Sequence, residues 1–161
     1  MIEGFLDALA GAGIGEWLNG WRWTYPIVNA SHILGIGLLF GAILPLDLRL
    51  LGCWPEVPVA GLARVLVPVA GSGLAIALVT GVLLFSVDPH YYAGLDLFQL
   101  KLALIGLAVV NLALLHRSAG WRVLRTGAAT GAGAGWVRLA GLLSAGLWLA
   151  VIFCGRFVAY V

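Results

Sequence analysis

The order of apolar and polar residues divides the chain into four long apolar segments joined by short polar stretches. The segments run from about residue 24 to 46, 62 to 87, 97 to 115 and 137 to 158. A helix needs roughly 20 predominantly apolar residues to cross the hydrocarbon core of a bilayer. The pattern therefore predicts four transmembrane helices. Short connections favour an all-α fold, an antiparallel four-helix bundle that makes one membrane domain of residues 1–161.

Residues 1–23 have a different pattern. Apolar residues are mixed there with Glu3, Asp7 and Glu16, and no basic stretch precedes them as it would in a cleavable signal peptide. The mixture predicts an N-terminal helix that lies in the membrane interface. Four aromatic residues then mark the expected water boundary of the first span, and these are Trp17, Trp21, Trp23 and Tyr25.

Composition strengthens the assignment to a membrane. Hydrophobic residues make up 62% of the chain and charged residues only 10%, whereas a soluble domain carries about 25% charged residues. These values exclude a soluble domain, a disordered chain and a nucleic-acid-binding protein, and they make the lipid bilayer the expected partner. The net charge of +2 is too small to indicate a polyanionic partner. Cys53 and Cys154 are far apart, and we expect two free thiols.

The basic residues predict an orientation. Loops rich in Lys and Arg remain in the cytoplasm, and six arginines flank the loops after the first and third spans: Arg49, Arg64, Arg117, Arg122, Arg125 and Arg138. We therefore expect a multi-pass protein of the bacterial inner membrane with both termini in the periplasm. The Gly- and Ala-rich stretch 127–135 is expected to be a flexible cytoplasmic linker.

Ionisable residues inside spans are costly and are functional candidates by default. His32 lies about eight residues into the first span, or roughly 12 Å along a helix. Gly37 and Gly41 follow it in a GxxxG spacing that allows another helix to approach. The same lack of side chains would admit the face of a porphyrin. His32 is therefore expected either to hydrogen-bond a neighbouring helix or to ligate a metal or haem.

Three more residues are expected near the outer side of the bundle. Lys101 and Arg156 lie near the outer ends of the third and fourth spans, where they would either snorkel to the interface or bind an anionic ligand. Haem propionates are one such ligand, and Arg–carboxylate pairing would suit Arg156. His90, in the loop 88–92, is expected either to be solvated or to supply a second metal ligand.

The other polar residues of the spans have simpler expected roles. Asp47 and Arg49 are predicted to pair with each other. His116 lies roughly 16 Å deeper than His32 by helical rise, so the two cannot share one iron, and we expect His116 at the interface. Thr80 and Asn111 are predicted to hydrogen-bond across helices.

Two stretches of the sequence are similar to known families. The segment from Tyr25 to Gly41 resembles the first span of CopD-type copper-resistance membrane proteins, and the segment from Phe98 to Asn111 resembles their lysine- and asparagine-containing helix. HemJ-type protoporphyrinogen oxidases are similar in layout. Their haem-ligating histidine in an early span and their lysine opening a later one match His32 and Lys101. The closing segment 155–160 resembles the end of a related family of small four-span bacterial proteins.

These observations lead to one preferred function and two alternatives. We expect a haem b-binding electron-transfer or redox subunit with the haem near the periplasmic face, His32 as axial ligand, and Lys101 and Arg156 on the propionates. A periplasmic redox protein or a membrane subunit would be its partner, and an oligomer is possible. The alternatives are a CopD-like copper permease using His32 and His90, and a cofactor-free scaffold. Nothing indicates hydrolytic or nucleotide chemistry, and whether the chain is an enzyme stays open.

Overall fold

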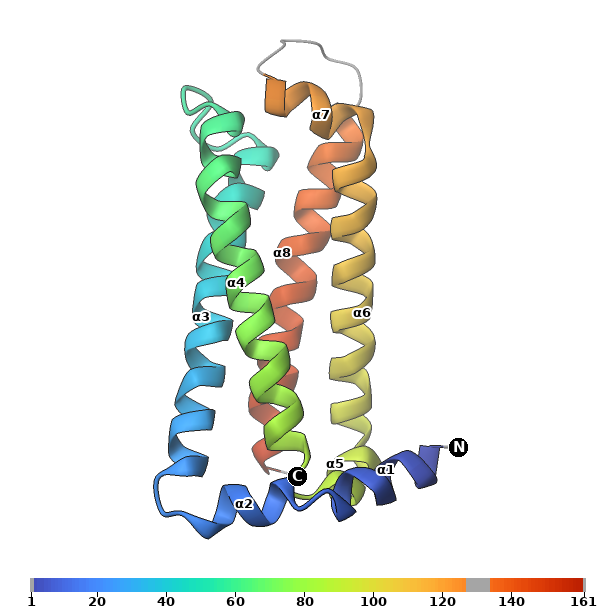
Figure 1. The fold of residues 1–161 in the computed structure, drawn as a ribbon. Coiled ribbons are helices and arrows are strands. Elements are labelled where there is room, and N and C mark those ends of the chain that lie inside the picture. The colour runs from blue at the N-terminus through green and yellow to red at the C-terminus, as the bar shows by residue number, and fades with distance from the viewer. Residues whose placement is uncertain (1, 127–133, 161) are drawn as a thin grey trace.

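The computed structural model describes residues 2–126 and 134–160, and all its regular structure there is helical. Figure 1 shows the elements in chain order, which are α1 (Ile2–Gly11), α2 (Ile14–Gly20), α3 (Thr24–Leu51), α4 (Val59–Phe85), α5 (Pro89–Gly94), α6 (Asp96–Arg117), α7 (Ala119–Thr126), α8 (Ala134–Phe157) and the short 3-10 helix η1 (Val158–Tyr160). The predicted all-α membrane bundle is confirmed. Most of the predicted linker, residues 127–133, lies outside the described residues.

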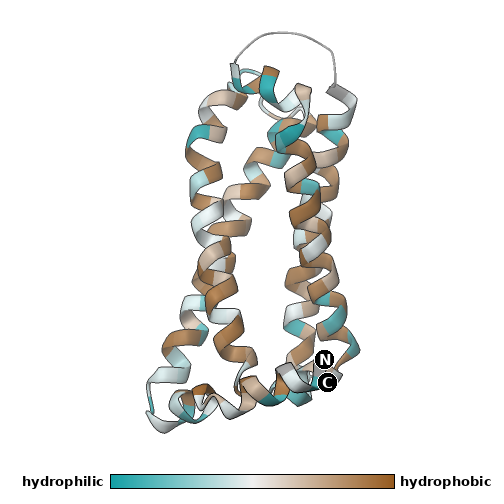
Figure 2. Ribbon diagram, turned by 45° about the vertical axis from the view of Figure 1, so that its right-hand side comes forward, coloured by the Kyte–Doolittle hydropathy of each residue, from teal (hydrophilic) through white to brown (hydrophobic). Residues whose placement is uncertain are grey.

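Helices α3, α4, α6 and α8 are the four predicted spans. Each contains a window with a mean hydropathy of 2.0 or more and is long enough to cross a membrane, and apolar residues run along all four (Figure 2). Many large apolar side chains point outward, where hydrocarbon rather than water would suit them; examples are Ile33, Val79, Leu107 and Phe153. The molecule is therefore a multi-pass membrane protein with the bilayer as its environment.

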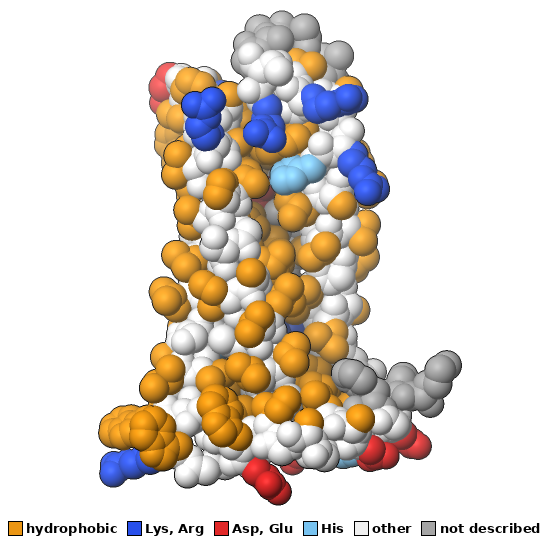
Figure 3. Space-filling model, viewed as in Figure 1, with side chains coloured by type: hydrophobic (Ala, Val, Ile, Leu, Met, Phe, Trp, Pro, Cys, Tyr) orange, Lys and Arg blue, Asp and Glu red, His pale blue; other side chains and the backbone are white. Residues whose placement is uncertain are grey.

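The two ends of the bundle differ in charge. Both termini lie at one end together with α1, α2 and α5 (Figure 1), and we call this the terminal end. The other end carries α7, the α3–α4 loop and the six arginines of the predicted cytoplasmic loops, and we call it the arginine end. In Figure 3, most blue side chains lie at the arginine end and most red ones at the terminal end.

The N-terminal segment forms two short helices rather than the single helix that its pattern predicts. The break falls at Gly13, whose φ of 70° lies in the left-handed region that favours glycine. Helices α1 and α2 run across the terminal end, roughly at right angles to the long helices (Figure 1). This arrangement agrees with a segment that lies along a membrane surface.

Helices α3 and α4 pack backbone against backbone through two glycines. A Cβ atom on Gly73 would lie 2.5 Å from the backbone nitrogen of Leu39 and 2.7 Å from the carbonyl oxygen of Gly35. Within this chain no described helix approaches Gly37 or Gly41, because a Cβ on either would meet no described atom within 4 Å, so their GxxxG spacing stays a prediction about another partner. Those two glycines lie on exposed positions of α3, so small residues alone did not identify the contacting face.

The four spans are packed in the order α4, α3, α8 and α6. Helix α3 packs on α4 and α8, and α6 packs on α8. Helices α4 and α6 meet near the terminal end, where the rings of Phe85 and Phe98 stack with 5.2 Å between centroids, but elsewhere their described backbones scarcely approach each other. Helix α7 covers the arginine end and contacts α4, α6 and α8. The bundle is therefore open between α4 and α6, and the face that these helices share is hollowed in Figure 3.

Candidate functional site

His32 lies half-buried on α3, with its ring against α4. Its Nδ1 is 2.9 Å from Oγ1 of Thr80, and that oxygen lies 2.6 Å from the backbone carbonyl oxygen of Ile76. The threonine hydroxyl has one proton, which it donates to this carbonyl. It can therefore only accept from His32. The chain of hydrogen bonds assigns the ring proton to Nδ1 and leaves a lone pair on Nε2.

The surroundings of the imidazole ring fit this arrangement. A Cβ atom on Gly81 would lie 3.2 Å from Cε1 of His32, so the glycine provides the space into which the ring fits. The prediction that Thr80 hydrogen-bonds across helices is confirmed.

Lys101 is the second predicted residue in this part of the bundle. Its side chain packs on α8, where a Cβ atom on Gly155 would lie 3.4 Å from Nζ. The ammonium group interacts electrostatically with His32. Among the described residues, no carboxylate lies within ion-pair distance of it. The structure thus brings His32 and Lys101 into one neighbourhood, with the lysine charge uncompensated.

Arg156 and His90 have partners elsewhere. The Arg156 guanidinium lies 4.9 Å from the ring centroid of Tyr160 and donates a hydrogen bond to its hydroxyl. His90 on α5 pairs with Asp7 on α1, with 3.2 Å between Nε2 and Oδ1, and both side chains are more than half exposed. In the described part of the chain, no group of three or more His, Cys, Asp or Glu residues is placed to hold a metal ion.

Helix α5 helps to close the bundle at the terminal end. The ring of Tyr92 lies 5.9 Å from that of Phe98 on α6, between centroids. Burial raises the pKa of Tyr92, and the nearby Tyr25, Tyr91 and Asp88 raise it further. Because the ordinary pKa of tyrosine is already about 10, this phenol stays protonated at neutral pH and can donate a hydrogen bond.

The predicted pair of Asp47 and Arg49 does not form. Arg49 instead donates to backbone carbonyls of the α3–α4 loop, from Nε to Val57 at 2.6 Å and from Nη2 to Pro55 at 3.0 Å. Residues two apart on a helix point to nearly opposite sides. With Arg49 turned to the loop, Asp47 points into the bundle and is only 3% exposed. The prediction is wrong for this geometric reason.

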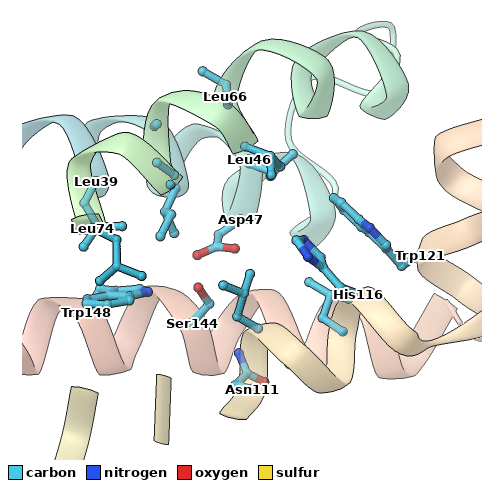
Figure 4. A pocket seen from close by; sticks show the side chains of 17 residues that line it. Leu39, Leu46, Asp47, Leu66, Leu74, Asn111, His116, Trp121, Ser144 and Trp148 are labelled. Carbon is cyan, nitrogen blue, oxygen red and sulfur yellow. The ribbon is translucent and has the colours of Figure 1, made fainter. Parts of the chain in front are cut away.

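Asp47 lies on the wall of a cavity of about 120 Å³ that all four spans enclose near the arginine end. Figure 4 shows its carboxyl group and the Ser144 hydroxyl pointing toward each other from α3 and α8, and these side chains interact. Oδ2 of Asp47 has no hydrogen-bond partner among the described residues. Asn111, also on the wall, donates from Nδ2 to the carbonyl of Ala140 at 2.9 Å, which confirms its predicted bond between helices.

A stacked ring pair separates this cavity from the surface of the arginine end. The rings of His116 and Trp121 lie 5.0 Å apart between centroids, with 19° between their planes. Both residues line the cavity, and both also line an open surface pocket together with Arg122 and Arg125. His116 lies in the last turn of α6, as its predicted place at the interface requires, but it also contacts the interior.

The described residues therefore form two polar regions inside the bundle, one at His32 and one at Asp47. They are 15 residues apart on α3, or roughly 22 Å along the helix axis. The second region was missed because a single carboxylate beside an arginine is typical of a surface pair. The two-residue spacing of that pair is the sequence feature that could have revealed the second region, because it directs the two side chains apart.

Comparisons with protein-family models, curated proteins and solved structures found no match to this chain.

Proposed function

We propose that the protein is a membrane-embedded haem b-binding protein with an electron-transfer or redox role, and that His32 is the axial ligand. The hydrogen bond from Nδ1 of His32 to Thr80 carries this proposal. A metal-ligating histidine almost always donates its other ring N–H to an acceptor, which fixes the tautomer and the ring orientation. His32 has this second hydrogen bond, and the lone pair of Nε2 is the group that would bind iron.

Lys101 supports the same assignment. A lysine inside a span without a carboxylate partner is unfavourable unless an anion compensates its charge. A haem propionate would be such an anion and would pair with the Lys101 ammonium. Arg156 is a weaker candidate for binding the second propionate, because its guanidinium already interacts with Tyr160. A bound haem would supply one-electron chemistry.

The proposed location follows from the charge of the two ends. With the arginine end in the cytoplasm, the terminal end and His32 would lie toward the periplasm of a bacterial inner membrane. The haem would then exchange electrons with a periplasmic redox protein or with a membrane subunit. The proposal includes a relationship to the CopD-type and HemJ-type families. The match of His32 and Lys101 to the HemJ layout supports it.

An absorption spectrum of the detergent-purified protein tests the proposal. We expect reduced-minus-oxidised bands of b-type haem in the native chain and their loss in His32→Ala. His90→Ala is the matched control, because it removes an exposed histidine that bonds only at the surface. It should keep the bands. A purified protein that stays colourless after haem supplementation would contradict the proposal, as would a folded His32→Ala variant with an unchanged spectrum.

Metal analysis of the same samples tests the copper alternative. Stoichiometric copper that disappears in His32→Ala would favour a permease over a haem protein. The geometry adds no support to this alternative, because His90 is engaged with Asp7 on the surface. A sample with neither haem nor copper would favour the second alternative, a cofactor-free scaffold.

A further inference from the structure

We propose that the cavity at Asp47 binds the hydroxyl group of an aromatic ring that arrives from the bilayer. The head group of a quinol and a lipophilic phenol share this chemistry. The site is separate from His32, and the proposal does not depend on haem. It rests on the buried carboxyl group, the lining of the cavity and the open side of the bundle.

The buried carboxyl group needs a partner. Asp47 is 97% buried, and its Oδ2 has no hydrogen-bond partner among the described residues. A buried polar atom without a partner costs on the order of 1–3 kcal/mol. An ionised carboxylate accepts hydrogen bonds, whereas a protonated one also donates. A hydroxyl group can both donate and accept, so it satisfies Oδ2 whether or not that oxygen carries the proton, whereas an ammonium group can only donate to it.

The lining of the cavity indicates a ring rather than water alone. A few polar groups converge at one side around Asp47, and most of the remaining wall is apolar, including Leu39, Leu66, Leu74, Leu115 and Trp148. A buried water needs two to four polar partners, which this apolar part does not offer. A cavity of about 150 Å³ with an apolar lining holds benzene. The volume here, about 120 Å³, is about four-fifths of that value, so one ring fits if the wall yields slightly toward the open side. Such a mixed lining is typical of ligand sites.

The open side of the bundle gives a lipid-soluble ligand a route to the cavity. Helices α4 and α6 meet through the stacked rings of Phe85 and Phe98 near the terminal end, but their described backbones scarcely approach each other beside the cavity. Both helices line the cavity, through residues such as Ala70 and Leu112. A ring could enter between them while an alkyl tail stays in the hydrocarbon. Toward the arginine end the stacked rings of His116 and Trp121 separate the cavity from the surface. The bilayer is therefore the direction from which we expect the ligand.

Calorimetric titration of the native chain in lipid nanodiscs tests the site. The probes are 4-heptylphenol and heptylbenzene, which differ only in the hydroxyl group, and empty nanodiscs supply the correction for partition into lipid. We expect the phenol to bind at least about tenfold more tightly, because only the phenol can form a hydrogen bond with the buried carboxyl group. Equal affinities, or heats equal to those of empty nanodiscs, would mean that water alone occupies the cavity and would overturn the proposal.

Three variants make the test specific. Asp47→Leu should abolish the preference for the phenol, so that both probes bind with similar affinity. Glu56→Gln changes an exposed carboxylate of the α3–α4 loop and should keep the preference. Ala70→Leu places a larger side chain on the cavity wall and should weaken both probes. A preference that survives in folded Asp47→Leu would overturn the proposal.

Two further measurements identify the ligand source and keep this proposal separate from the haem proposal. Displacement of 4-heptylphenol by heptylhydroquinone, held reduced with dithionite, would assign the cavity to quinol head groups, and phenol binding without displacement would assign it to other phenols. His32→Ala should lose haem bands yet keep the phenol preference. A chain without haem that shows the preference would contradict only the haem proposal, and a chain with haem that lacks it would contradict only this one.

Discussion

The hydroxyl group of Thr80 decides which nitrogen of His32 carries the proton. Thr80→Val has nearly the same shape but removes the acceptor for Nδ1–H. Loss of such an outer partner typically costs 10–100-fold in metal affinity. We expect haem affinity to fall by this factor in Thr80→Val, measured by titrating the haem-free protein with haem and following its absorption.

The control for this change is Thr80→Ser, which keeps the hydroxyl and should bind haem nearly as well as the native chain. A reduction potential measured on both variants distinguishes a role in tuning the ligand from a role in packing, since only the former moves the potential. Native affinity and native potential in Thr80→Val would contradict the assigned role of Thr80.

Single residues were predicted unevenly from the sequence. His32 and Lys101 were identified because ionisable groups deep in a span are rare and costly. Asp47 was misjudged because the sequence places an arginine two residues later, and the apparent pair hid the fact that the two side chains point apart. The partner of Asp47 in the bundle, Ser144, lies 97 positions later, and no local pattern indicates such a contact.

At the level of the helices, Gly73 determines how closely α3 and α4 can approach. Its missing Cβ would lie 2.5 Å from the backbone nitrogen of Leu39, and backbone atoms cannot move aside as a flexible side chain can. We expect Gly73→Ala to destabilise the bundle by about 1–3 kcal/mol, the range for overpacking. Thermal unfolding in detergent, followed by circular dichroism, measures the loss.

Gly37→Ala is the matched control for Gly73→Ala. A Cβ there meets no described atom within 4 Å, and alanine is favoured over glycine in a helix by up to about 1 kcal/mol. This variant should be as stable as the native chain or slightly more stable. Equal losses in both variants would contradict the packing derived for Gly73.

Asn111 makes a second contact between helices, from α6 to α8. Replacing it with leucine removes the hydrogen bond to the Ala140 carbonyl. Hydrogen bonds between membrane helices contribute about 0.6–2 kcal/mol, so we expect a loss of that size in the free energy of unfolding. Val109→Leu changes an exposed position of the same helix and should have no measurable effect. A larger loss in Val109→Leu than in Asn111→Leu would contradict the assigned contact.

The sequence predicts where the long helices lie along the chain better than it predicts which of their faces pack together. The four spans were predicted within a few residues, because length and apolar composition alone decide whether a segment crosses a bilayer. The sequence did not predict which helix faces meet. Gly35, Gly37 and Gly41 have the same small size, yet only Gly35 contacts α4 closely. In lipid, an apolar side chain gains little by choosing a neighbouring helix over a hydrocarbon tail, so hydropathy does not mark the contacting face.

For the whole molecule, the open side between α4 and α6 connects the fold with the ligand proposed for the Asp47 cavity. It follows from long-range packing, with α3 between α4 and α8, and no property of a single segment predicts it. A closed bundle would exclude a ring from the Asp47 cavity. The charge difference between the two ends, in contrast, was visible in the sequence, because arginines cluster in two loops that an antiparallel bundle must bring to one end.

That charge difference predicts the orientation of the molecule in the membrane. Six arginines lie at the arginine end, whereas three basic residues, Arg22, Lys101 and Arg156, lie at or near the terminal end beside five acidic residues, so the arginine end should face the cytoplasm. Cys53 is an exposed thiol in the α3–α4 loop at that end. In the Cys154→Ser variant, a membrane-impermeant maleimide should leave Cys53 of intact spheroplasts unmodified and should modify it after permeabilisation.

A cysteine at the opposite end completes the measurement. Asn19 is exposed on α2 at the terminal end, and Asn19→Cys in a chain with both native cysteines changed to serine should react in intact spheroplasts. The two sites thus give opposite patterns in one experiment. Modification of Cys53 but not of Asn19→Cys would mean that the chain is inverted. His32 would then lie toward the cytoplasm, and a periplasmic redox partner for it would be ruled out.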